Sequence, residues 1–109
     1  MTLSELCEKL PLRIVTGETT GEFSGVYAGD LLSRAMSHVK FENLWITIMA
    51  NTNVVAVASL TEAAAVILAE GVELLPEALD AAEENGITVL ASDMTVYELC
   101  VRINEILAV

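Results

Sequence analysis

The sequence predicts an α/β fold: a single small domain over residues 1–109, with a mostly parallel sheet of about five strands and helices packed on it. Two observations predict this class. Short runs of aliphatic and β-branched residues alternate with segments of helical periodicity, and capping residues, Pro or Gly stand at most of the boundaries. The run Leu44–Met49 is almost continuously apolar, which is typical of a strand covered on both faces.

The chain is expected to begin with a helix that Thr2 and Glu5 close as a capping box. Pro11 ends this helix because it cannot continue the hydrogen-bond ladder. A short strand is expected over residues 12–15. The segment 16–24 is rich in Thr and Gly, has no periodicity and lacks the Walker pattern, so it is interpreted as a loop.

A second short strand is expected over residues 25–28, followed by a helix that Asp30 can cap. The buried side of this helix is expected to contain Leu31, Leu32, Ala35, Met36 and Val39. The run Leu44–Met49 is the strongest strand of the chain, and Trp45 within it is expected to belong to the core.

The segment after Asn51-Thr52-Asn53 is ambiguous, since its apolar residues fit one face of a strand or one side of a helix. A helix is preferred because Asn53 is a good N-cap. A strand-helix-strand order also gives a right-handed parallel crossover onto the next strand, over residues 65–69.

The last third contains a helix over residues 76–85 with a proline in its first turn and Gly86 at its C-terminal stop. A buried strand over residues 87–91 comes next. Thr95 and Glu98 form a second capping box, which starts the final helix. The buried side of that helix is expected to contain Val96, Leu99, Cys100, Ile103 and Leu107.

The net charge of −11 is unevenly distributed. Beyond residue 50, Arg102 is the single basic residue. Nucleic-acid backbones and anionic lipid surfaces both need a basic face, so neither partner is expected. The chain has no apolar run of the roughly 20 residues that cross a bilayer, and its N-terminus lacks the features of a signal peptide, so a cytoplasmic location is expected.

Residues that carry chemistry are sparse. Cys7 and Cys100 lack metal-ligand spacing and lie on apolar helix faces, so they are interpreted as reduced core thiols. His38 is the single histidine, which excludes a site with several histidine ligands. No nucleophile elbow, HExxH, GxGxxG or kinase signature is found, so no catalytic residue, metal or cofactor is predicted.

The candidate ligand site is the edge where the parallel strands end, because open α/β sheets bind ligands beyond the carboxyl ends of their strands. The residues directly after the five expected strands are small or polar, and several turns lead to helix N-termini that favour an anion. They are Thr16, Gly17, Gly29, Asp30, Asn51, Thr52, Asn53, Glu70, Gly71, Ser92 and Asp93. The structural alternative stays open, because every α/β domain needs caps and turns at these places.

Three segments also carry a family resemblance: Gly25–Ser33 (GVYAGDLLS), Leu44–Thr47 (LWIT) and Asn53–Leu60 (NVVAVASL). With them, nearly the whole chain resembles the DRTGG domain family, which is similar to the N-terminal domain of HPr kinase/phosphorylase and to the middle domain of long phosphotransacetylases. The resemblance implies a small α/β fold, an accessory or regulatory role, and association into dimers or higher assemblies. It implies no kinase activity, since the P-loop domain is absent. The family's Asp-Arg pair is replaced in the matching segment 20–25.

The leading hypothesis is therefore a non-enzymatic regulatory module that works as a homodimer. It would bind a small anionic metabolite or nucleotide at the strand-end edge, centred on Asn51–Asn53. The alternative is a pure interaction domain that pairs with itself or with a partner enzyme and has no ligand. An enzyme whose site depends on Asp30 or Asp93 is a third hypothesis.

Overall fold

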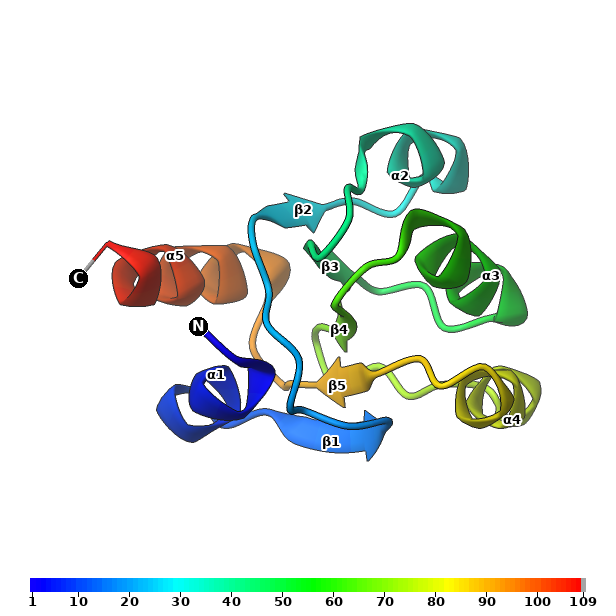
Figure 1. The fold of residues 1–109 in the computed structure, drawn as a ribbon, viewed down its shortest axis with the longest axis horizontal. Helices are drawn as coiled ribbons and strands as arrows, with labels where there is room; N and C mark the ends of the chain where they lie inside the picture. Colours follow the sequence, from blue (N-terminus) through cyan, green and yellow to red (C-terminus); the bar gives the residue numbers. More distant parts are fainter. Residues whose placement is uncertain (109) are drawn as a thin grey trace.

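The computed structural model describes residues 1–108 and confirms the predicted α/β class. Within these residues, five helices and five strands alternate along most of the sequence (Figure 1). In chain order they are α1 (Leu3–Lys9), β1 (Arg13–Thr16), β2 (Val26–Ala28), α2 (Leu32–His38), β3 (Leu44–Thr47), α3 (Thr52–Thr61), β4 (Ala65–Leu68), α4 (Pro76–Glu84), β5 (Val89–Ala91) and α5 (Val96–Leu107).

The five strands form one sheet in the order β1-β5-β4-β3-β2. Strands β2, β3, β4 and β5 are parallel to one another, and each step between them is a crossover through a helix. Strand β1 is antiparallel to β5, with Arg13 opposite Ala91. The sheet is therefore mostly parallel, as predicted, with one reversed edge strand.

The burial of the central strands agrees with their sequences. Every residue of β3, β4 and β5 is buried, which agrees with their continuous apolar runs. The side chain of Trp45 is fully buried in β3, so its predicted place in the core is confirmed. Among residues 1–108, no buried side-chain nitrogen or oxygen lacks a hydrogen-bond partner.

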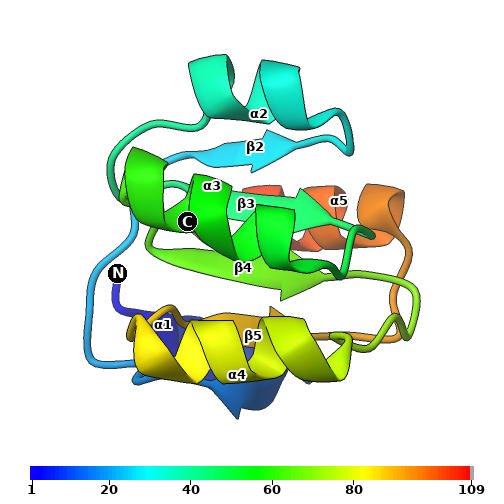
Figure 2. The same ribbon diagram turned by 90° about the vertical axis from the view of Figure 1, so that its right-hand side faces the viewer.

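Two helical layers cover the sheet (Figures 1 and 2). Helices α2, α3 and α4 lie side by side on one face and pack on a core cluster that includes Trp45 and Leu68. Helices α1 and α5 cover the other face and pack on a second cluster that includes Ile46 and Leu90. Neighbouring residues of one strand thus serve opposite layers, as the alternation of side chains along a strand requires. No helix within the described chain has the length and apolar character that a membrane crossing needs.

Both predicted capping boxes are confirmed: Thr2 with Glu5 starts α1, and Thr95 with Glu98 starts α5. The N-cap of α3 was predicted at Asn53, which is too late in the chain, since Asn51 holds it and accepts a bond from the Asn53 amide. Asp30 was predicted to cap α2, and this is wrong, because the N-cap residue is Leu31.

The buried sides of two helices also differ from prediction. Leu31 and Met36 were placed on the buried side of the α2 helix, but their exposed fractions are 64% and 52%. Leu107, predicted to be buried on α5, is 46% exposed. Helix α2 lies at the β2 edge of the sheet (Figures 1 and 2) and packs mainly against α3, so only a narrow side of it is buried.

Candidate ligand-binding site

The structure brings nine of the eleven candidate residues to one edge of the sheet, because the strands that precede them are parallel and end together. Thr16 and Gly17 lie at the opposite edge. They stand at the end of β1, which runs the other way, and Thr16 pairs with Val89 at the start of β5. A Cβ on Gly17 would stand 2.6 Å from the Thr88 backbone, so this glycine serves close packing at the far edge.

Asp30 fastens the chain entering α2 to the end of β3. One carboxylate oxygen accepts a 2.8 Å hydrogen bond from the Thr47 hydroxyl and a 3.0 Å bond from the Ile48 amide. Thr47 is fully buried, and its hydroxyl oxygen in turn accepts from the Met49 amide at 3.2 Å. The bonds from Thr47 and Ile48 commit one oxygen of this carboxylate to the protein's own structure.

Gly29 is held in a similar way. Its carbonyl oxygen accepts a 3.0 Å bond from the Trp45 indole, and its amide donates to the Ile46 carbonyl at 3.1 Å. A Cβ at this position would stand 3.1 Å from the Tyr27 ring. Gly29 therefore satisfies the buried indole N–H and leaves room for a neighbouring aromatic ring.

The turn Asn51-Thr52-Asn53 is exposed at the start of α3. The Asn51 side-chain oxygen accepts a 3.1 Å bond from the Asn53 amide, so the chain itself satisfies one of the free N–H groups at this helix end. Thr52 lines a groove of about 410 Å³ between α3 and α4.

The turns after β4 and β5 are joined by backbone bonds. The Glu70 amide donates to the Met94 carbonyl at 2.8 Å, and the Gly71 amide donates to the Ser92 carbonyl at 2.9 Å. Glu70 and Gly71 both adopt positive φ, at 60° and 73°. The Ser92 hydroxyl accepts from the Met94 amide at 3.0 Å. These backbone bonds hold the turns after β4 and β5 together at the carboxyl edge of the sheet.

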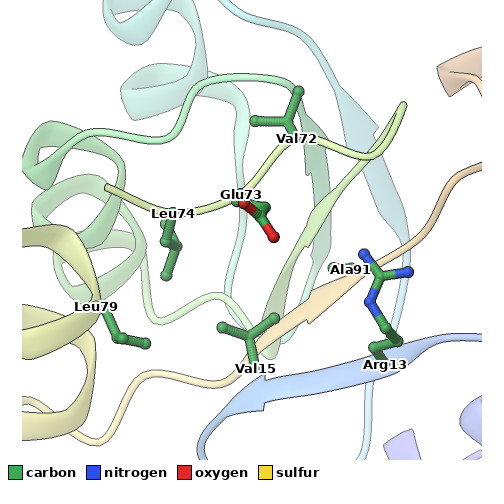
Figure 3. Close-up of a pocket in the computed structure, with 7 residues that line it drawn as sticks. All are labelled: Arg13, Val15, Val72, Glu73, Leu74, Leu79 and Ala91. Carbon is green, nitrogen blue, oxygen red and sulfur yellow. The ribbon is translucent and has the colours of Figure 1, made fainter. Parts of the chain in front are cut away.

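A cavity of about 320 Å³ opens beside these two turns, between β1, the loop after β4 and helix α4 (Figure 3). Figure 3 shows side chains from all three segments around the opening. The lining residues are Arg13, Val15, Val72, Glu73, Leu74, Leu79 and Ala91. The cavity thus has apolar walls and two charged side chains of opposite sign, a composition common among small-molecule sites.

Arg13 supplies the cationic group of this cavity. Because β1 is antiparallel, its first residue rather than its last lies at the carboxyl edge of the parallel strands. A terminal nitrogen of the guanidinium stands 3.4 Å from a carboxylate oxygen of Asp93, and the two side chains are 54% and 85% exposed. An ion pair this exposed is weak, so an incoming anion can compete with Asp93 for the guanidinium.

Sequence reasoning missed Arg13 because it treated every strand as parallel and searched only the residues after each strand's last position. A signal was available. The strand over residues 12–15 lies between a helix and a long loop, without the crossover helix that a parallel neighbour requires.

The other side chains with reactive or metal-binding groups lie apart from one another in the part of the chain that the structure describes. Within residues 1–108, no three His, Cys, Asp or Glu side chains are grouped so as to hold a metal ion. Burial raises the pKa of the Cys7 thiol and of the Cys100 thiol, which lowers their reactivity. The His38 ring stacks on Tyr27 with centroids 5.9 Å apart, and its Nδ1 lies 2.9 Å from the Arg34 carbonyl oxygen.

Comparisons with known proteins reveal a fold but no family assignment. No family model matches the chain, and no curated protein matches it. A solved structure is similar: the CBS and DRTGG domains of the regulatory region of a Clostridium perfringens pyrophosphatase, complexed with its activator diadenosine tetraphosphate. The TM-score is 0.69 at 12% sequence identity, over 89% of this chain and 43% of that chain. The chain thus spans less than half of that regulatory region and shares its fold with part of it. Membership of the DRTGG family stays a prediction.

Proposed function

We propose that this protein is a non-enzymatic regulatory module that binds a small anionic metabolite or nucleotide at the carboxyl edge of its parallel strands and works as a homodimer. The observation that carries the proposal is the guanidinium of Arg13 beside a cavity of about 320 Å³ at that edge. The similar pyrophosphatase region, which is regulatory and binds a nucleotide activator, supports this class of function by analogy of fold.

The electrostatics favour the Arg13 end of the edge over its middle. Asp30 and Glu70 lie along the rest of the edge, and the chain has no Lys or Arg between Lys40 and Arg102. Asp93 and Glu73 lie at the Arg13 end, where the guanidinium offsets part of their negative charge. A phosphate or carboxylate placed near Asn51 would meet uncompensated negative charge from the protein. Beside Arg13 it would gain a planar, bidentate donor.

The test is a thermal-shift screen of the wild-type protein against nucleotides and phosphorylated metabolites, at two protein concentrations. A ligand at about a hundred times its dissociation constant adds roughly 2.7 kcal/mol of stability. For a domain of this size that raises the melting temperature by on the order of 10 °C. If no compound of either class raises the melting temperature, the ligand proposal is wrong.

Two variants locate the site. Arg13→Gln is expected to abolish the increase in melting temperature. Arg102→Gln, which removes a similarly exposed arginine on helix α5, is expected to keep it. The variants Asn51→Ala and Asn53→Ala test the centre of the site that the sequence predicts. If they lose the ligand while Arg13→Gln binds it, the site lies at the start of α3 instead.

A second candidate function is a pure interaction domain without a ligand. The exposed apolar side chains favour it, including Leu31, Phe41 and Leu60 with exposed fractions of 64%, 64% and 72%. This function predicts a melting temperature that rises with protein concentration while no metabolite in the screen changes it.

A further inference from the structure

Helix α3 has an unusual outer surface. Its ten residues, TNVVAVASLT, include no charged side chain. The side that faces away from the sheet is uncharged although it is exposed: Asn53, Ala56, Ser59 and Leu60 are all exposed. A helix in contact with water on one side usually carries charges there, and a helix that is apolar nearly all round is usually covered on both sides. The composition of α3 indicates that something covers it.

The two helices beside α3 carry charges of opposite sign. Helix α2 and the residues directly after it hold Arg34 and Lys40 and no acidic residue until Glu42. Helix α4 holds Glu77, Asp80, Glu83 and Glu84 and no basic residue. Figure 2 shows that α3 lies between α2 and α4 in this layer. By sequence, the layer is therefore basic at α2, uncharged at α3 and acidic at α4.

This arrangement is complementary to itself. When two copies place these layers face to face about a two-fold axis that runs along α3, α2 of each copy lies against α4 of the other, and α3 lies against α3. An axis in the same plane but at right angles to α3 would instead set α2 against α2 and α4 against α4. The charge pattern favours the first arrangement and opposes the second.

We propose that the layer formed by α2, α3 and α4 is the homodimer interface, with the two-fold axis along α3 and with α2 of each copy against α4 of the other. Exposed apolar side chains lie on the elements that this contact would cover, namely Leu60 on α3 and Met36 on α2, 72% and 52% exposed. The groove of about 410 Å³ between α3 and α4 has an apolar floor that includes Val55 and Ala81, and it lies where α2 of the second copy would be seated. A flexible methionine side chain is well suited to fill such a groove.

The inference rests on the proposed homodimer and deepens it. It can be tested apart from the ligand site, because the cavity beside Arg13 includes Leu79 of α4 but no residue of α2 or α3. A monomeric variant with substitutions on α2 or α3 is therefore expected to keep the ligand shift, and Arg13→Gln is expected to keep the dimer.

The first test reverses the charges of each flank and measures the mass in solution by light scattering and sedimentation velocity. The wild-type chain of 11.7 kDa is expected at twice its mass. Arg34→Glu with Lys40→Glu, and separately Asp80→Lys with Glu84→Lys, are each expected to weaken the dimer by roughly a hundred-fold or more, since both set like charges against each other. Mixing the two variants is expected to restore a heterodimer, and all four substitutions in one chain are expected to restore the homodimer.

The second test compares the two helical layers. Ala56→Arg places a charge near the two-fold axis on an exposed position, so the chain should fold and remain a monomer. Its control is Tyr97→Arg, at a side chain that is 77% exposed on α5, and this variant should remain a dimer. Circular dichroism checks that both variants are folded.

Two results would overturn the inference. A wild-type protein that stays a monomer at high concentration has no homodimer interface, and the uncharged face of α3 then serves a different partner. A dimer that survives Ala56→Arg and is lost with Tyr97→Arg has its interface on the α5 layer. In either case the ligand screen still reports independently on Arg13.

Discussion

The two helical layers of this protein cover the sheet with helices of different outer surface. Helix α5 buries Leu99 and Ile103 and turns charged residues such as Glu98 and Arg102 to solvent, so one side packs and the other is hydrated. Helix α3 buries Val54, Val55, Val57 and Ala58 but has no charged side. Both cover the same sheet, one on each face. Burial by the chain itself accounts for one side of α3, and in the proposed dimer the second copy covers the other side.

The two layers also differ in how the N-termini of their helices are capped. Helices α1 and α5 each begin with a complete capping box. Among residues 1–108, α2 and α4 begin without a side-chain cap, at Leu31 and Leu75. Helix α3, in the same layer as α2 and α4, has the Asn51 side-chain cap but no capping box. Local capping is therefore complete in the α1 and α5 layer and partial in the other layer. Substitutions in each layer can test this contrast.

The largest effect is expected from Leu99→Ala in α5. Leu99 is fully buried against the sheet, so its truncation should leave a cavity and lower the free energy of unfolding by about 2–5 kcal/mol. Urea denaturation measures it. The loss should be the same at low and high protein concentration, because this layer takes no part in the proposed dimer, and a loss that depended on concentration would contradict the contrast.

Asp30→Ala is expected to cost about 1–3 kcal/mol, since it leaves the buried Thr47 hydroxyl and the Ile48 amide without their acceptor. The test is a comparison with Asp93→Ala, an exposed carboxylate in a weak ion pair, which should change the free energy of unfolding by less than about 0.5 kcal/mol. Equal effects would show that Asp30 has no special role in attaching α2 to the sheet.

Thr95→Ala removes the N-cap of α5 and is expected to lower the free energy of unfolding by about 1 kcal/mol. Pro76→Ala at the start of α4 serves as the comparison, because no side-chain cap is lost there. Chemical denaturation of both variants under the same conditions decides whether local capping matters more in the α5 layer.

Glu98, the second residue of the α5 capping box, makes a smaller contribution to stability, and this contribution depends on pH. The backbone amide of Thr95 donates to the Glu98 carboxylate and, with the Thr95 hydroxyl, lowers its pKa below the ordinary value. A carboxyl group whose pKa is lower in the folded state stabilises the fold above its unfolded pKa, and this contribution is lost as the pH falls through the folded value. Glu98→Gln should therefore be less stable than wild type at neutral pH, and the gap should narrow in acid.

The smallest effect on the isolated fold is expected from Leu60→Ala. Its exposed position implies a change of less than about 0.5 kcal/mol in a dilute, monomeric sample. In a concentrated sample the same substitution should remove part of the stabilisation that the dimer adds, so the gap from wild type should widen with concentration. Melting curves over a hundred-fold range of concentration measure this, and a constant gap would contradict the proposed role of α3.

The sequence was sufficient for the fold class because the apolar runs at Leu44 and Ala65 are unambiguous and because the two capping boxes obey local rules. It was insufficient where the outcome depends on distant partners. Residues 12–15 themselves do not specify that β1 pairs with a strand more than 70 residues away, and the sign of its antiparallel direction lies outside them, in the missing crossover helix before β2. This direction moved Thr16 and Gly17 off the edge and brought Arg13 to it.

Asp30 illustrates the same limit at the level of a single side chain. An aspartate just before a helical segment is an ordinary N-cap by propensity, yet the groups that it binds lie at the end of β3, 17 and 18 residues further along the chain. Helix-capping preference correctly indicated that Asp30 has a structural role but predicted the wrong hydrogen bonds. The donors that Asp30 does bind come close to it only when β2 and β3 pair in the folded sheet.

The sheet order has a consequence for how the chain acquires its structure. Strands β3, β4 and β5 are consecutive in sequence and adjacent in space, so they can assemble through crossovers of about twenty residues. Strands β1 and β2 are also consecutive but occupy opposite edges, and the loop between them must pass the end of the whole sheet. Contacts that close long loops form late and open first. The centre of the sheet is thus expected to be the slowest part of the backbone to exchange its amide protons, and the β1 edge, which carries Arg13 of the proposed ligand site, is expected to exchange faster.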